Sequence, residues 1–178
     1  MMVKALSFEG RSMIRALDTD EVAAILAVVN DGAQAYCGVI PGDCWQEPYM
    51  PEAELLSELD AGVRFWGLEK DGQLAGVMGR QELPEVTLIR HAYVRTDFQR
   101  QGIGKRLLSF LLQGLKPPVL VGTWAAAWWA VKFYEGHEFR LVTPVEKERL
   151  LRAHWTISDR QIETSVVLTW EPVATTPQ

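Results

Sequence analysis

The amino-acid sequence predicts an α+β fold in which helices and one mixed sheet form a single domain. Two β-rich segments are joined by Lys70-Asp71-Gly72, and Asp-Gly between such segments is a strong hairpin signal. Apolar residues that recur every three or four positions after residue 21 indicate an amphipathic helix. A chain of 178 residues, 48% of them hydrophobic, is long enough for one sizeable core. We therefore expect one domain over residues 1–172 and a polar tail over residues 173–178.

The first half of the chain should begin with a strand at residues 13–17. A helix follows because Val22, Ile25, Leu26, Val29 and Ala33 share one face. Residues 36–51 contain several prolines and aromatics and are expected to be irregular. A second helix begins after Pro51, since proline and acidic side chains are typical of a helix start. Strands are predicted at residues 63–68, 73–80 and 86–95.

The second half should alternate helices and strands. Residues 102–113 form an amphipathic helix that Pro117-Pro118 ends, and the mostly apolar residues 119–124 form a buried strand. The remaining predictions are a helix at residues 126–136, a strand at 139–142, an extra helix at 146–155 and a last strand at 162–170. This order predicts a mixed sheet with helices packed against it.

Composition excludes several classes of protein. A net charge of −5 argues against broad nucleic-acid binding, which needs a basic surface. No apolar segment approaches the roughly 18 residues of a membrane span, and residues 1–12 lack a secretory signal. Cys37 and Cys44 are too few for a disulfide framework or a four-cysteine zinc site. We expect a cytoplasmic protein without a metal.

A glycine-containing loop follows the strand that ends near residue 95. Because the first turn of a helix leaves N–H groups unpaired at its positive end, the Gly102-Ile103-Gly104 turn can hold a phosphate. Four basic residues accompany one acid there (4 − 1 = +3), namely Arg95, Arg100, Lys105, Arg106 and Asp97. A P-loop and a dinucleotide fingerprint do not fit, because Gln99, Arg106 and Leu107 occupy the positions that those motifs fix.

Two motifs resemble those of the GNAT superfamily of N-acetyltransferases. The segment Gln99-Arg100-Gln101-Gly102-Ile103-Gly104 matches the pattern Gln/Arg-x-x-Gly-x-Gly/Ala, whose loop binds the pyrophosphate of acetyl-coenzyme A in that family. The segment at residues 130–135 resembles the Ala-x-x-Phe-Tyr-Glu helix of the family, and Phe139 matches the aromatic that follows it. The resemblance covers roughly residues 13–142 and implies a mixed, mostly antiparallel central sheet flanked by helices.

The resemblance also implies roles for individual residues. Acetyl-coenzyme A would be the cosubstrate and a primary amine of a small molecule or peptide the acceptor, with possible homodimers. Tyr134 matches the general acid, which protonates the departing thiolate, and a phenol is protonated at neutral pH. The backbone near Val94 would face the thioester carbonyl. The implied cofactor-binding residues are Ala92, Tyr93, Val94, Gln99, Arg100, Gln101, Gly102, Ile103, Gly104, Lys105, Lys132 and Phe133.

The group that removes the proton from the amine is left open. His91 on the fourth strand and Glu82 at the end of the third are candidates, and a chain of water molecules is an alternative. Arg90 is expected to be a surface or structural residue. The acceptor would bind near the aromatic residues of the irregular segment, such as Tyr36, Trp45 and Tyr49, or these residues would only close the core.

Two positions depart from the family pattern. Ala127 replaces a common Asn near the pantetheine, and Glu138 replaces the usual Gly before the final aromatic. The alternative to an enzyme is therefore a non-catalytic acyl-coenzyme A binding or regulatory module. Transfer of a longer acyl group also stays open.

Overall fold

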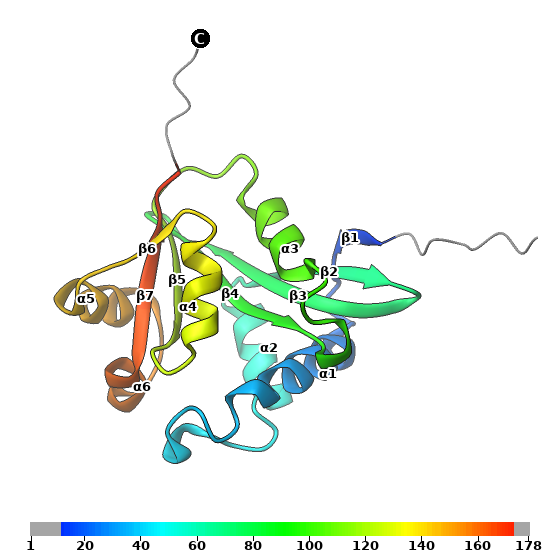
Figure 1. The fold of residues 1–178 in the computed structure, drawn as a ribbon, viewed down its shortest axis with the longest axis horizontal. Coiled ribbons are helices and arrows are strands. Elements are labelled where there is room, and N and C mark those ends of the chain that lie inside the picture. The colour runs from blue at the N-terminus through cyan, green and yellow to red at the C-terminus, as the bar shows by residue number, and fades with distance from the viewer. Residues whose placement is uncertain (1–11, 173–178) are drawn as a thin grey trace, which may run out of the picture.

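One seven-stranded sheet organises the protein in the computed structural model, which describes residues 12–172 (Figure 1). The spatial order of the strands is β1-β2-β3-β4-β5-β7-β6. Their bounds are β1 Met13–Ala16, β2 Arg64–Lys70, β3 Gln73–Glu82, β4 Thr87–Val94, β5 Val119–Trp124, β6 Phe139–Leu141 and β7 Ser165–Trp170. Only β4 and β5 pair in parallel, so the predicted mixed sheet of an α+β fold is confirmed. The predicted tail at residues 173–178 lies outside the described residues.

Helices cover both faces of this sheet. Their bounds are α1 Val22–Gly32, α2 Glu52–Asp60, α3 Ile103–Leu112, α4 Trp128–Glu135, α5 Pro144–His154 and α6 Asp159–Thr164. One core cluster joins α3 and α4 to one face of the sheet. Two further clusters join α1 and α2, and α5 and α6, to strand residues of the opposite face. Every helix in this described part of the chain falls short of the length and apolar content that a membrane crossing requires.

The predicted last strand was wrong at its beginning. Residues 159–164 form α6, and β7 starts only at Ser165. The Ser158 hydroxyl accepts from the Gln161 N–H, and the Gln161 side chain accepts from the Ser158 N–H. This capping box provides the start signal for a helix. Both edges of β7 are paired, one with β5 and the other with β6.

The chain turns before β6 at one of the positions that depart from the family pattern. Glu138 has φ 66°, in the left-handed region that favours glycine, whereas Gly136 has an ordinary φ of −68°. The turn therefore has the backbone conformation that suits glycine, with a glutamate in that place. Phe139 follows it and is buried in the core against Tyr134, with ring centroids 5.4 Å apart.

The sheet opens between β4 and β5. These strands pair over three residues only, Thr87–Ile89 against Val119–Val121. Beyond this point β4 continues along β3 as far as Val94, while β5 stays paired with β7 as far as Trp124. The edge of β4 that faces β5 is therefore without a strand partner after Ile89.

A bulge interrupts β4 inside this opening. Val77 of β3 is opposite Tyr93 and Gly79 is opposite Arg90, so two residues of β4 face the single residue Met78. His91 is one of the two, and its φ of 51° is the local irregularity. Arg90 and His91 consequently point to the same face, toward α2, instead of alternating.

A close contact fixes α1 against β4 near this opening. A Cβ added to Gly32 would be 2.9 Å from the Val94 carbonyl oxygen and 3.1 Å from the Tyr93 Cβ. Neither of these atoms can move without a shift of the β4 backbone.

We expect Gly32→Ala to lower the free energy of unfolding by about 1–2 kcal/mol, because overpacking displaces α1 or β4. Urea denaturation followed by circular dichroism measures this change. Gly42→Ala is the control, since an added Cβ there meets nothing within 4 Å, and it should stay within about 0.5 kcal/mol. Equal stability of the two variants would contradict the close packing of α1 on β4.

Candidate active site

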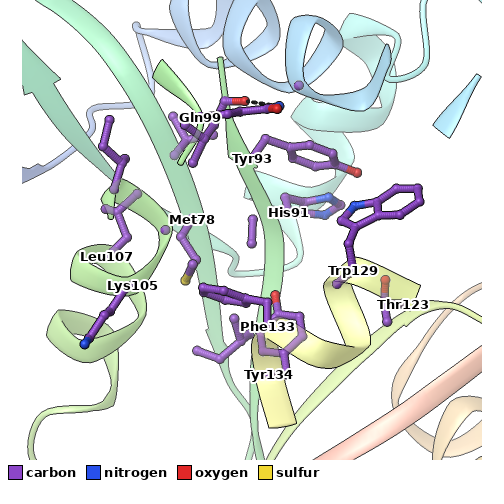
Figure 2. A pocket seen from close by; sticks show the side chains of 18 of the residues that line it. Met78, His91, Tyr93, Gln99, Lys105, Leu107, Thr123, Trp129, Phe133 and Tyr134 are labelled. Atoms are coloured by element: carbon purple, nitrogen blue, oxygen red, sulfur yellow. Dashed lines mark hydrogen bonds between the residues drawn. The ribbon is translucent and has the colours of Figure 1, made fainter. Parts of the chain in front are cut away.

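Two cavities meet where β4 and β5 separate. The first has a volume of about 520 Å³ and lies between β4, α3 and α4 (Figure 2). The second has a volume of about 790 Å³ and is lined by α2, the segment before it and the α5–α6 region. Six residues line both cavities: Tyr36, Ile89, His91, Tyr93, Gly122 and Thr123. The two spaces therefore adjoin each other at the opening in the sheet.

The glycine loop forms one end of the first cavity. Gly102 precedes α3 with φ 76°, and no heavy atom lies within 4 Å of an added Cβ. No side chain caps the start of this helix. Its backbone hydrogen bonds begin with the Arg106 N–H, which donates to the Gly102 carbonyl at 3.0 Å. The open backbone and the helix dipole suit an anionic group. Gly104 is different, because an added Cβ would be at an ordinary 3.5 Å from Phe133.

The four basic residues of the loop divide into two pairs. Arg100 and Lys105 line the first cavity. Arg95 donates to the Leu74 carbonyl, and Arg106 donates to Ser12, so both are used in local structure. The positive charge available to a ligand therefore comes from Arg100, Lys105 and the start of α3.

Most of the predicted cofactor residues come together in the first cavity. It is lined by Ala92, Tyr93, Val94, Gln99, Arg100, Gly102, Ile103, Gly104, Lys105 and Phe133. Gln99 donates to the Val94 carbonyl at 3.4 Å, which ties the loop to the strand (Figure 2). Two residues are not brought there. Gln101 accepts from Lys70 and donates to Asp97, and Lys132 is exposed beside Glu135 at 2.7 Å.

The three catalytic candidates have different surroundings. Tyr134 is buried and lines the first cavity, and burial raises the pKa of its phenol above the ordinary value. It is therefore protonated throughout the neutral range. His91 lines both cavities. Glu82 is exposed at the end of β3, paired with Arg80 at 2.8 Å, and lines neither cavity.

A buried charged cluster holds His91. Its Nε2 is 3.1 Å from the Glu58 Oε2, and Arg90 pairs with the same carboxylate at 2.9 Å. The Glu58 Oε2 and the His91 Nε2 nevertheless lack an aligned hydrogen-bond partner among the described residues. Burial acts to raise the pKa of Glu58, but its contacts with His91 and Arg90 outweigh burial and lower it. Glu58 is therefore ionised at neutral pH.

Tyrosines form the boundary between the cavities. The rings of Tyr36 and Tyr49 are 5.7 Å apart, and Tyr93 is 6.2 Å from Tyr36. The Trp124 indole N–H donates to the Tyr49 hydroxyl at 2.8 Å. Burial raises the pKa of Tyr36 to about 12, and that of Tyr93 well above its ordinary value. These phenols therefore stay neutral at neutral pH.

The sequence analysis did not identify Glu54 and Glu58 as site residues. They are four residues apart on α2, so they share one helix face, and both line the second cavity. The four-residue spacing indicates from the sequence that the two carboxylates lie on the same side of α2. It does not indicate that this side faces β4. Arg90, expected to be a surface or structural residue, is inward-facing and paired.

Comparisons with known proteins agree with this architecture. The family model described as "Acetyltransferase (GNAT) domain" matches residues 23–154, well over half of the chain. The split sheet and the glycine loop at the start of α3 thus belong to an acetyltransferase-type domain. The chain belongs to the GNAT family. No curated protein matches it.

Solved structures share the fold at low identity. One is the paiA N-acetyltransferase of Thermoplasma acidophilum in complex with coenzyme A, at 15% identity and a TM-score of 0.68, covering 91% of this chain and 99% of that one. Another is the ribosomal-protein-S18-alanine N-acetyltransferase of Escherichia coli, at 16% identity and a TM-score of 0.63, covering 94% of this chain and 100% of that one. A third is the N-acetylglutamate synthase of Neisseria gonorrhoeae, at 16% identity and a TM-score of 0.62, covering 90% of this chain and 35% of that one.

Proposed function

We propose that the protein is an acetyl-coenzyme A-dependent N-acetyltransferase that acts on a primary amine of a small molecule or peptide. The observation that carries this proposal is that the two cavities share wall residues at the opening between β4 and β5. This arrangement would let an acyl donor in one cavity meet an amine in the other. Similar folds with coenzyme A bound, in T. acidophilum and N. gonorrhoeae, support the choice of donor.

The first cavity would hold the donor by three features of this chain. The N–H groups at the start of α3, with Arg100 and Lys105, would bind the pyrophosphate. The unpaired edge of β4 beyond Ile89 would pair with the amide groups of the pantetheine arm, as an added strand does. By the same argument, an N–H near Val94 would stabilise charge on the thioester oxygen.

His91 and Tyr134 would handle the protons. The imidazole of His91 would accept a proton as the amine nitrogen bonds to the acetyl carbon, and Glu58 would position that ring. As the carbon–sulfur bond breaks, the Tyr134 hydroxyl donates its proton to the sulfur. Proton exchange with solvent restores both side chains. Glu82 has no part in this scheme, because it lines neither cavity.

The first test is titration calorimetry of acetyl-coenzyme A against the wild type and Gly102→Glu. We expect the variant to lose at least tenfold in affinity, because it places bulk and negative charge at the start of α3. Gly114→Glu is the matched control, since Gly114 also has a positive φ with open space but lies beyond the other end of α3. Loss of binding in both variants, or in neither, would contradict the predicted pyrophosphate site.

Tyr134→Phe should reduce kcat by about 100-fold while acetyl-coenzyme A binds as in the wild type. The ring packing against Phe133 and Phe139 is kept, and only the hydroxyl is lost. Release of coenzyme A thiol under saturating amine measures kcat. An unchanged kcat would remove Tyr134 from the mechanism.

His91→Gln should lower kcat/KM by about 100-fold for an alkylamine, which is protonated at neutral pH. The loss should shrink for a weakly basic amine that is already neutral, because that amine has less need of a base. Thiol release with the two amines gives the comparison. An equal loss for both would assign His91 a structural role, and thiol release that no amine accelerates would favour a non-catalytic acyl-coenzyme A binding module.

A further inference from the structure

We propose that the second cavity selects an acceptor with two cationic nitrogens, a short aliphatic diamine, and that Glu54 binds the nitrogen that does not react. The inference rests on the proposed function, because it places the reacting nitrogen at His91. It adds the chemical class of the acceptor, which neither the fold nor the catalytic residues determine.

The charges of the second cavity leave one carboxylate without a partner. Its wall contains the acids Asp43, Glu54 and Glu58 and the bases Arg90 and Arg160. Arg160 pairs with Asp43 at 2.8 Å, and Arg90 pairs with Glu58 at 2.9 Å. No ion pair involves Glu54 within residues 12–172. Among these five side chains the acids outnumber the bases by one, and the carboxylate left without an ion pair is that of Glu54.

The environment of Glu54 suits a cation. Glu54 is an exposed residue on the cavity wall, and partial desolvation of its carboxyl raises its pKa, against the attraction of His91 and Arg90. A bound ammonium would compensate for the lost solvation. Tyr36, Tyr49 and Tyr93 line the same cavity, and aromatic rings also attract ammonium groups. A carboxylate ligand would instead meet repulsion from Glu54.

The spacing along α2 sets the length of the acceptor. Glu54 lies one helical turn before Glu58, which contacts His91, so the two acidic side chains start about 5–6 Å apart. The reacting nitrogen must lie at His91, where the two cavities meet. A second nitrogen at Glu54 would then be about one helical turn from the reacting one, which favours a short aliphatic linker such as the four carbons of 1,4-diaminobutane. Because the base has to leave the reacting nitrogen neutral, only the distal nitrogen needs a carboxylate partner.

Three amines of equal length isolate the contribution of the second charge. We would measure binding of 1,4-diaminobutane, butylamine and 4-aminobutanoate by calorimetry to protein saturated with coenzyme A. The wild type should bind the diamine at least fivefold more tightly than butylamine, and 4-aminobutanoate least tightly of the three. In Glu54→Gln the ratio of diamine to butylamine affinity should fall to within twofold of one.

Glu52→Gln is the matched control. Glu52 is exposed on the first turn of the same helix and lines neither cavity, and the substitution removes the same charge. It should keep the wild-type ratio. A wild type that does not distinguish the diamine from butylamine, or a Glu54→Gln variant that keeps the preference, would overturn the inference.

A thiol-release assay with acetyl-coenzyme A separates this inference from the proposed function. Acetylation of butylamine and the diamine at equal efficiency would support the transferase and overturn the role of Glu54. Preferential binding of the diamine that depends on Glu54, without any thiol release, would support the cation site and contradict the transferase.

Discussion

The separation of β4 from β5 is the constraint on which the site depends. Each strand keeps its other neighbour, so β4 follows β3 and β5 follows β7, and the two halves of the sheet diverge after three paired residues. Divergence leaves one edge of β4 without a neighbouring strand after Ile89, a cost that a protein normally avoids. An extended ligand that pairs with this edge would offset the cost. Because of the same divergence, His91 and Thr123 line the cavities on both faces of the sheet.

The charged cluster beneath the opening shows how burial and charge compensation act together. The Glu58 carboxylate contacts both Arg90 and His91, and only 12% of the Arg90 side chain is exposed. Because Arg90 already compensates the charge of this carboxylate, Glu58 can contact the imidazole without being an unpaired charge in the interior. Glu54, one turn earlier on α2, forms no ion pair with any residue that the structure describes. The two carboxylates therefore differ in what they can bind, although the sequence presents them as equivalent.

The sequence predicted the parts of the site that depend on local chemistry. The glycine loop, its basic residues Arg100 and Lys105, and the Phe133-Tyr134 pair follow from motifs and from the rules of helix starts, and they lie around the first cavity. The strand that was predicted to begin at residue 162 begins after a six-residue helix, because a capping box competes with the β-rich pattern there. Glu82 was a reasonable base from its place at a strand end. Only tertiary packing shows that α2 brings Glu58 to His91 while Glu82 stays in solvent.

The bulge in β4 has a consequence for how this strand can change in length. His91 is the extra residue, so the flanking pairs Val77–Tyr93 and Gly79–Arg90 match a regular strand from which it has been removed. Deleting its single codon would leave Ala92 and Val94 facing α3 and α4, and Tyr93 facing α1. Most single-residue insertions in a sheet reverse every side chain that follows. At this position one inserted residue adds an imidazole where the two cavities meet and leaves the hydrophobic core unchanged on both sides.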